Sequence, residues 1–520
     1  MKKGVITVYL ALTFSVLLSI FISALEAAKI SAYRLIAECA VQNGIISAFG
    51  EYNRELLKQY DLLFVDLSYQ TDKASVNALS DHVGDYIGQN LSEPESRYLY
   101  ARDFWGSGTA ETNVCAVRMA SDEFGGVLKN QAVEYVKDEV PVFFIEDLMS
   151  LVRIKEEYSL DKESFDKYKS ELKEQAEEAL NEDKSGKETE DGEETDSSGK
   201  KKYSEADELL IKEMTDWDIE IKYLKPIDLL ILKKNAKDVS AKIFNPLDMP
   251  SMRVANFQKV DKELKENSFD PFENVYFTEY IMRKSGNYVR PKENSYLKYE
   301  AEYIFAGQNN ESANLSYTIH AIFYIRTVAN IISLKNDKEK SEIVQSIGDG
   351  LASFTPVPSA VYQGLIYCIW AAGESTFDVE DLLKGEKVSL IKKGSDFNLS
   401  VSGGIRNLLA DSKREIKSLP DHSGGKNLPA ESSLGEYSEN SKELSVDIKL
   451  SYEDYLRILI LTTASDFTTL RLMDVIETDL RQSEGNSHFR IDMCTDAVVF
   501  ECTVVDSNGI LYELKRKYCY

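Results

Sequence analysis

The residues best suited to metal or redox chemistry are six cysteines and four histidines, and their spacing supports neither use. No two cysteines form a Cys-x-x-Cys pair, so a zinc site or a thioredoxin-like site gains no support. The histidines lie far apart in the chain, which argues against a metal cluster. We therefore predict no metal and no cofactor for Cys39, Cys115, Cys368, Cys494, Cys502, Cys519, His82, His320, His422 and His488.

One disulfide is conceivable near the end of the chain. If Asp506 to Gly509 turns a hairpin, Cys519 falls near Cys494 on the facing strand. Free buried thiols are the alternative, and we favour them. The hairpin itself is predicted by the apolar segments that flank the turn.

Carboxylates are the other candidate catalytic groups, because two acids can work as a general acid and a general base. Glu374, and Glu300 with Glu302, could be imagined as such pairs. The chain has a formal net charge of −26, so we predict that these acids are exposed and solvate the surface. No phosphate-binding loop, Gly-x-Ser-x-Gly elbow, His-Glu-x-x-His motif or dinucleotide fingerprint is present. Nothing selects a Ser-His-Asp triad, and we predict no enzyme.

The element that positions everything else is the segment Val5 to Leu25, which has 21 residues and no charge. As a helix it covers roughly 32 Å, enough to cross a bilayer core of about 30 Å. Lys2 and Lys3 precede it and predict a cytoplasmic N-terminus, with the bulk of the chain extracellular. A cleaved signal peptide is the alternative. The apolar core is longer than a signal needs and the cleavage site is poor, so we favour a retained single-pass anchor in the cell membrane.

Apolar residues continue beyond the anchor at spacings of three and four, which mark one face of a helix. Small residues on this stripe let another helix or a sheet approach closely. A membrane helix that continues into an amphipathic helix is typical of pilin-like subunits, and an anchor followed by a plain stalk is the alternative. The predicted partner-helix stripe comprises Ile30, Tyr33, Ala37, Ala40, Gly44, Ala48 and Tyr52, and it extends to Leu56.

Length and charge limit what the rest of the chain can be. The 520 residues allow about three folding units, at about 150 residues per domain. A pI near 4.8 argues against nucleic acid, or an anionic membrane surface, as the main partner. An acidic, well-solvated ectodomain is the simplest interpretation.

The periodicity along the chain predicts an α+β protein, in which an extracytoplasmic helical bundle packs on antiparallel strands with disordered insertions. Strands are expected over 60–69, 217–223, 298–306, 387–391, 489–505 and 510–520. Helices are expected over 76–91, 124–137, 314–334, 343–354, 360–372, 378–384, from 451, and over 467–480.

Two polar segments interrupt this pattern. Glu182 to Lys202 has almost no apolar residue, so it cannot bury enough surface to offset its conformational entropy. The division that follows is a membrane anchor and stalk helix at 1–60, a first α+β segment at 61–154, a charged and largely disordered insertion at 155–206, a main α+β ectodomain at 207–410, a flexible loop at 411–440, and C-terminal helices with a β-hairpin at 441–520.

One turn is similar to a known metal site. Asp66-Leu67-Ser68 follows an apolar strand and is similar to the Asp-x-Ser-x-Ser loop with which von Willebrand type A domains hold magnesium. The third ligand position is Gln70, which departs from that pattern. We favour a strand end followed by an Asp-Ser turn.

Several short stretches along the chain form a recognisable set. They are 3–10, 26–29, 52–57, 60–64, 131–135 (Gln-Ala-Val-Glu-Tyr), 299–304 (Tyr-Glu-Ala-Glu-Tyr-Ile), 381–385, 452–457 (Tyr-Glu-Asp-Tyr-Leu-Arg) and 473–477. Together they resemble an uncharacterised family of membrane-anchored surface proteins from Gram-positive anaerobes. The N-terminus is similar to TadE- and TadG-like components of tight-adherence pilus systems. A prepilin cleavage site would follow Gly4, and would place Glu where this chain has Tyr9.

The resemblance implies a non-enzymatic, extracytoplasmic component of a tight-adherence-like pilus or secretion assembly. Other pilus or envelope proteins would then be its partners, and no nucleic acid. A stand-alone surface adhesin or sensor that binds an extracellular ligand is the alternative. A membrane-tethered hydrolase is the third and least favoured hypothesis.

Overall fold

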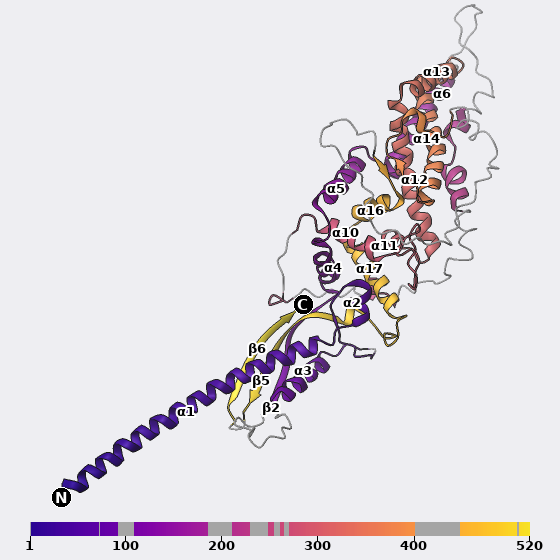
Figure 1. Cartoon of the computed structure of the whole chain (residues 1–520). Coiled ribbons are helices and arrows are strands. Elements are labelled where there is room, and N and C mark those ends of the chain that lie inside the picture. Colours follow the sequence, from indigo (N-terminus) through magenta and orange to yellow (C-terminus); the bar gives the residue numbers. More distant parts are fainter. Residues whose placement is uncertain are drawn as a thin grey trace, which may run out of the picture. The chain divides into compact units, whose positions relative to one another are not determined.

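A computed structural model of the chain describes residues 2–71, 73–91, 109–185, 211–228, 248–253, 261–264, 270–400, 448–506 and 509–520. The fold is α+β, as predicted, and it begins with one long apolar helix (Figure 1). The chain forms two compact units, each assembled from separate segments. Unit 1 comprises 1–134, 250–269 and 473–520, and unit 2 comprises 135–249 and 270–472.

Helix α1 runs without interruption over Lys2–Phe49, a length of 48 residues. Its N-terminal half projects away from the rest of unit 1 (Figure 1), and the most apolar window of the helix is 0% buried. By length and composition this helix can cross a membrane, although a signal sequence would pass the same test. The first proline of the chain is Pro94, so nothing in the sequence breaks the helix between its exposed and packed parts.

The predicted strand over 60–69 is mostly wrong. Helix α2 occupies Arg54–Tyr60, and Asn53 caps it by accepting the N–H groups of Glu55 and Leu56. The strand that follows, β1, is limited to Val65–Asp66. It is short because it pairs only with the first residues of a longer strand, where Val65 faces Thr495.

The sheet of unit 1 is built around strand β5 (Cys494–Val505). Strand β2 (Thr109–Met119) pairs along one edge of β5, and β6 (Leu511–Cys519) pairs along the other, all antiparallel. The two predicted C-terminal strands are therefore confirmed, although the first begins at Cys494 rather than at Phe489.

The hairpin register contradicts the disulfide hypothesis. Cys519 faces Ala497, which leaves Cys494 three residues further along the strand. Cys494 is buried whereas Cys519 is exposed, and both thiols are free. The predicted turn therefore identified the correct pair of strands, but in the observed register the two cysteines are not opposite each other.

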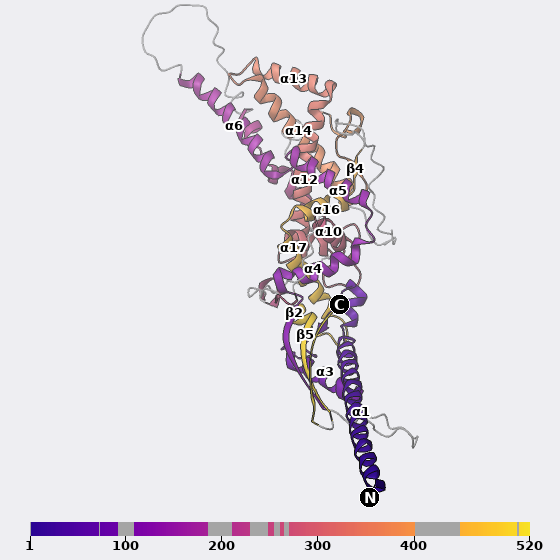
Figure 2. The same ribbon diagram turned by 90° about the vertical axis from the view of Figure 1, so that its left-hand side faces the viewer.

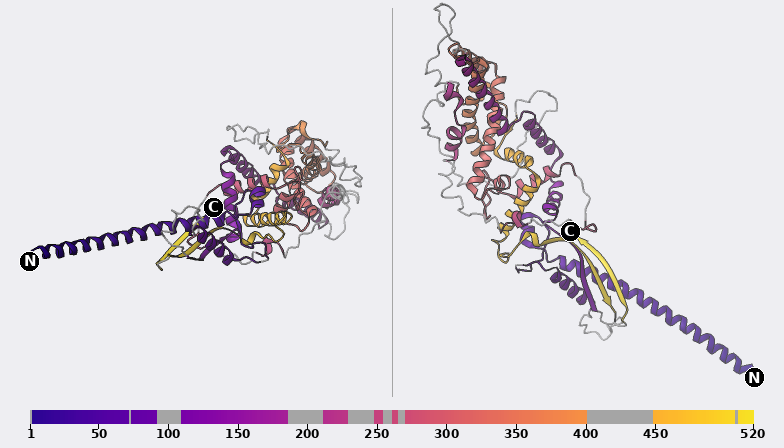
Figure 3. Two further views of the ribbon diagram at one scale, coloured as in Figure 1. Left: turned by 60° about the horizontal axis from the view of Figure 1, so that its bottom comes forward. Right: turned by 180° about the vertical axis from the view of Figure 1, so that it is seen from behind.

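One face of this sheet forms the core of unit 1. The C-terminal half of α1 and helix α3 (Val76–Leu91) lie together on that face (Figure 3). The alternation of β5 supplies the sheet side of the core, since Val498, Phe500, Cys502 and Val504 are all fully buried. The opposite face is partly covered by Leu264, which packs on Ala497 and Val499.

Unit 2 is a helical assembly with a small two-stranded sheet, β3 (Val388–Ser389) and β4 (Lys449–Leu450). Helix α12 (Glu311–Asn336) packs along α14 (Ser359–Leu383), and α13 (Lys338–Ala352) and α6 (Lys162–Ser185) pack against them (Figure 2). The helices with residues in this unit are the end of α4 (Asp122–Lys137), α5 (Val142–Glu157), α6 (Lys162–Ser185), α10 (Glu273–Lys284), α11 (Glu300–Ala306), α12 (Glu311–Asn336), α13 (Lys338–Ala352), α14 (Ser359–Leu383), α16 (Tyr452–Thr462) and the start of α17 (Ser465–Leu480).

Two predicted strands in this unit are wrong. A π-helical turn, Glu220–Leu224, overlaps residues 217–223, and 298–306 include α11. The alternation of Tyr-Glu-Ala-Glu-Tyr suggested a buried and an exposed face. In fact Glu300, Ala301, Glu302 and Tyr303 are all buried, so the alternation of residue types does not reflect an alternation of environments.

The expected helices over 76–91, 314–334 and 360–372 are confirmed, and α14 continues to Leu383. Of the charged insertion, residues 162–185 form α6, whose Phe165 and Ala176 are buried. Its part at 186–206 lies outside the described residues, as does the predicted loop at 411–440.

Gly44 decides how closely α1 approaches α3. A Cβ atom at Gly44 would lie 2.6 Å from Ile87 Cγ1 and 3.1 Å from the Ile87 nitrogen. We expect Gly44→Leu to destabilise unit 1 by about 2 kcal/mol or more, because the two helices must separate. The urea midpoint for maleimide labelling of buried Cys494 and Cys502, in the detergent-solubilised chain, measures the change.

Gly88→Leu is the matched control, because Gly88 lies on α3 and a Cβ atom added to it would meet nothing within 4 Å. There the better helix propensity of leucine should leave the free energy of unfolding unchanged or raise it by up to about 1 kcal/mol, so the urea midpoint should not fall. Equal midpoints for the two variants would contradict a close α1–α3 contact at Gly44.

Candidate functional site

The predicted partner-helix stripe lies mostly inside unit 1. Tyr33, Ala37, Ala40, Gly44 and Ala48 are buried in α1. Ile30, by contrast, is 43% exposed. Tyr52 lies beyond the C-terminal end of α1 and is half-buried.

Elements of the same chain contact this stripe. On the helix side, Ile87 of α3 meets Gly44. On the sheet side, the rings of Tyr33 and Tyr512 stand 5.3 Å apart, and those of Phe49 and Tyr518 stand 4.4 Å apart. The close approach that small residues predicted therefore serves packing within unit 1, and a contact with another protein through this stripe stays a prediction.

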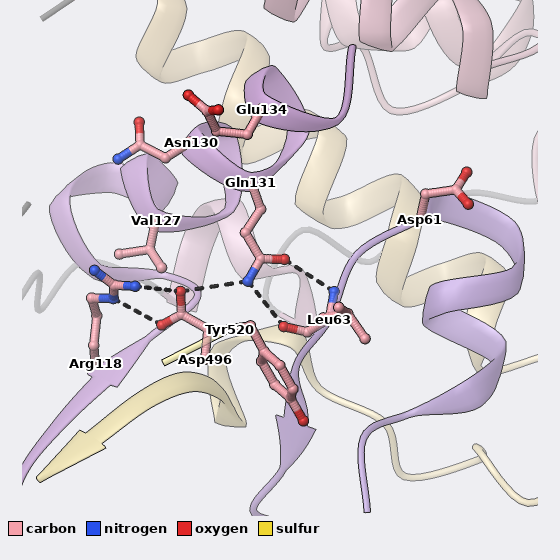
Figure 4. A pocket seen from close by; sticks show the side chains of 9 residues that line it. All are labelled: Asp61, Leu63, Arg118, Val127, Asn130, Gln131, Glu134, Asp496 and Tyr520. Atoms are coloured by element: carbon pink, nitrogen blue, oxygen red, sulfur yellow. Dashed lines mark hydrogen bonds and ion pairs between the residues drawn. The ribbon is translucent and has the colours of Figure 1, made fainter. Parts of the chain in front are cut away.

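A cavity of about 260 Å³ lies in unit 1 where three distant segments meet. Most of its lining residues are polar or charged, and they come from the loop after α2, from β2, from α4, from β5 and from the position after β6 (Figure 4). The lining residues are Asp61, Leu63, Arg118, Val127, Asn130, Gln131, Glu134, Asp496 and Tyr520.

Two interactions hold this cavity together. The Gln131 side chain accepts the Leu63 N–H at 3.0 Å and donates to the Leu63 carbonyl at 2.9 Å. The buried Arg118 guanidinium donates to both carboxylate oxygens of Asp496, at 2.9 and 2.7 Å (Figure 4). Arg118 also donates to the Leu264 carbonyl. Gln131, Arg118 and Asp496 thus bind groups of the chain itself, and they join the segments that line the cavity.

The turn beside the cavity is strained. Glu123 and Phe124 have φ values of 52° and 60°, in the left-handed region that side chains disfavour. Asp122 accepts the Met119 N–H at 2.8 Å, which fixes the start of this turn. Burial raises the pKa of Asp122 to about 6.

The similarity of 66–70 to a magnesium loop has a simpler structural basis. Asp66 Oδ1 accepts the Ser68 N–H at 2.8 Å, which forms the turn after β1 that we favoured. Within the described residues, no group of three or more His, Cys, Asp or Glu side chains could hold a metal ion.

One serine, histidine and aspartate do meet in unit 2. His320 Nε2 lies 3.0 Å from Asp228 Oδ1 and 3.3 Å from Ser316 Oγ, and Ser316 also donates to Asp228. A catalytic triad uses both ring nitrogens, one toward the serine and one toward the carboxylate. Here a single nitrogen faces both, so the arrangement does not relay a proton.

The acids proposed as paired carboxylates are not exposed, and that prediction is wrong. Glu300, Glu302 and Glu374 are each 0% exposed. Each accepts hydrogen bonds from backbone N–H groups of a neighbouring loop, which offsets part of the cost of burial. Glu300 accepts the Gly286 N–H at 2.9 Å, and Glu302 accepts the Tyr288 N–H at 2.7 Å.

Glu374 belongs to a buried ionic network. It accepts the N–H groups of Asn398 and Leu399, both at 2.9 Å, and binds Lys392 Nζ at 2.5 Å. Lys392 also contacts Asp378, which pairs with the fully buried Arg326. Two positive and two negative charges therefore balance, and the network fastens 390–399 to α12 and α14.

Glu302 is the least compensated of these acids. Its Oε1 accepts the Tyr288 N–H and the Tyr452 hydroxyl, at 2.7 and 2.8 Å, whereas its Oε2 is buried without a hydrogen bond. Burial raises the pKa of Glu302 to about 7, and the nearby Glu311 adds to the rise. Sequence periodicity could not reveal this site, because the donors come from segments far from α11.

The model of DUF5702, a family of unknown function, matches residues 212–506, which include parts of both units. No curated protein and no solved structure matches the chain.

A substitution at Gln131 tests whether its hydrogen bonds to Leu63 stabilise unit 1. We expect Gln131→Ala to destabilise unit 1 by about 1–3 kcal/mol, because the Leu63 N–H and carbonyl lose their partners. Asn130→Ala is the control, since Asn130 lines the same cavity, and we expect a change within about 0.5 kcal/mol. Labelling of Cys494 and Cys502 in urea measures both, and equal losses would contradict the structural role of Gln131.

The raised pKa of Glu302 predicts that the stability of unit 2 depends on pH. Its pKa is about 7 in the folded chain and 4.5 in the reference state, so folding favours the protonated form. Stability should fall as pH rises from about 4.5 to about 7, and Glu302→Gln should remove this fall, on the order of 1–3 kcal/mol. Urea unfolding followed by tryptophan fluorescence at about pH 5 and about pH 8 measures it.

Glu293→Gln is the control for this change, because Glu293 is an exposed acid in the loop before α11. The control should keep the pH dependence of the unaltered chain. If Glu302→Gln keeps it too, the buried carboxyl is not its source.

Proposed function

The chain belongs to DUF5702, a family of unknown function, and we propose that it is a membrane-anchored, extracytoplasmic and non-enzymatic component of a tight-adherence-like pilus or secretion assembly. The observation that carries the proposal is helix α1. One unbroken helix supplies both an apolar segment long enough to cross a bilayer and the buried stripe around which unit 1 packs.

The length and continuity of α1 support a retained anchor. A cleaved signal has an apolar core of about 7–15 residues before its cleavage site, whereas α1 stays helical throughout 20–30, beyond its long apolar segment. Lys2 and Lys3 support a cytoplasmic N-terminus, so that everything after Leu25 faces outward. The similarity of this N-terminus to TadE- and TadG-like components supports a place in such an assembly.

The described carboxylates support a non-enzymatic role. Glu300, Glu302 and Glu374 fasten loops, and the Asp496 carboxylate neutralises Arg118. Each of these acids is engaged by donors of the chain itself. Catalytic pairs need a reacting atom within reach of both groups, in a place that a substrate can enter.

A surface adhesin or sensor is the second candidate. Exposed apolar side chains near α13 favour it, because Ile343 is 40% exposed and Phe354 is 61% exposed. Such side chains supply affinity when a ligand covers them.

A deletion strain tests the proposal. We expect loss of the chain to abolish surface filaments or secretion by the assembly, and the full chain to restore them. A version whose residues 1–25 are replaced by a cleavable signal should not restore them, because it lacks the anchor. Electron microscopy of the cell surface and immunoblots of the medium give the readout.

N-terminal sequencing of the membrane-bound chain is the accompanying control. A start at Met1 is expected, a start at Val5 would indicate pilin-type processing, and a start near Leu25 would contradict a retained anchor. Unchanged filaments in the deletion strain would contradict the assembly role and favour the adhesin.

A further inference from the structure

A second stripe, here called the seam, is uncharged and mostly apolar, and it runs along the opposite side of α1 from the buried stripe. Its members alternate at spacings of four and three residues along almost the whole helix. They are Thr7, Ala11, Phe14, Leu18, Phe21, Leu25, Ala28, Ala32, Leu35, Cys39, Gln42 and Ile46.

This spacing is that of the a and d positions of a coiled coil. Successive seam residues are on average about 3.5 residues apart. A stripe with that period stays at one interface when two helices wrap around each other. A helix that meets a partner only locally does not need this period over its length. Every position of Val5–Leu25 is uncharged, so any stripe of the helix would keep this period there. The seam is distinguished in the packed half of α1, where it continues through the exposed residues Leu35, Cys39 and Ile46.

The seam is exposed in the half of α1 that packs in unit 1. Leu35 is 63% exposed and Ile46 is 45% exposed, and Cys39 is also exposed. The residues that α1 buries in its own unit, such as Ala37 and Gly44, lie on the other side of the helix. Unit 1 therefore leaves the seam open to a second helix.

We propose that a second copy of this chain covers the seam, so that two α1 helices form a parallel, in-register coiled coil through the membrane and beyond it. The inference rests on the proposed anchor. Two copies anchored through the same N-terminal segment have the same orientation in the bilayer, which is the parallel arrangement that the heptad spacing suits.

The chemistry of the seam favours an identical partner. In a symmetric pair each seam residue meets its counterpart. No seam residue is charged, although the chain carries a formal net charge of −26, so the pairing brings no like charges together at the interface. The two Gln42 amides can hydrogen-bond to each other, since an amide both donates and accepts, and one polar layer of this kind fixes register.

Oxidative cross-linking in membranes tests the proposal. In a full-length chain that retains Cys39 and carries Cys115→Ser and Cys519→Ser, two Cys39 thiols should form a disulfide when copper phenanthroline accepts their two electrons and the protons pass to water. Leu35→Cys and Ile46→Cys, each made with Cys39→Ser, should give the same product. The expected product has twice the mass of the chain on a non-reducing gel.

Arg34→Cys and Ser47→Cys are the matched controls, because both residues are exposed neighbours of seam positions and lie off the seam. Dimer yield should be several-fold higher at positions 35, 39 and 46 than at 34 and 47. Equal yields at all positions, no dimer at any position, or a product of different mass would each overturn the second copy as the occupant. If the membrane-bound chain still starts at Met1 in those cases, the anchor stands and the dimer alone fails.

Discussion

Burial of one face of α1 is the constraint on which unit 1 depends. Tyr33, Ala37, Gly44 and Phe49 close the core over one face of the sheet. Because the helix continues unbroken into its apolar segment, the packed half cannot turn or slide without moving that segment as well. A helix rises about 1.5 Å per residue, so the distance along α1 between the sheet and the apolar segment is fixed.

Unit 2 depends on a different device, the buried carboxylate that holds a loop. Glu300, Glu302 and Glu374 each accept backbone N–H groups from neighbouring loops. Burying a charge is costly, and it is tolerated only where donors and counter-charges are in place. Such contacts are directional, so they favour one loop conformation over its alternatives, which apolar packing alone does less well. An acidic composition thus contributes to the interior of the protein as well as to its surface.

Much of the helical architecture could be predicted from local periodicity, as at 76–91, 314–334 and 360–372. The strand predictions at 217–223 and 298–306 failed because alternation of residue types stands for alternation of environments only when the polar positions face water. Glu300 and Glu302 face protein donors. The cavity at Gln131 was equally out of reach, since Gln131, Leu63 and Asp496 are distant in sequence and no motif links them.

By itself the sequence determined the long apolar helix, the amphipathic stripe that follows it and the C-terminal hairpin, because each depends on the spacing of residues within one segment. Tertiary structure alone decided that β5 lies between β2 and β6, that Cys494 does not face Cys519, and that α3 approaches α1 closely at Gly44. It also decided that the acids of α11 and α14 are buried. These features depend on which distant segments meet, and pairwise contacts of that kind leave no periodic signal in a single sequence.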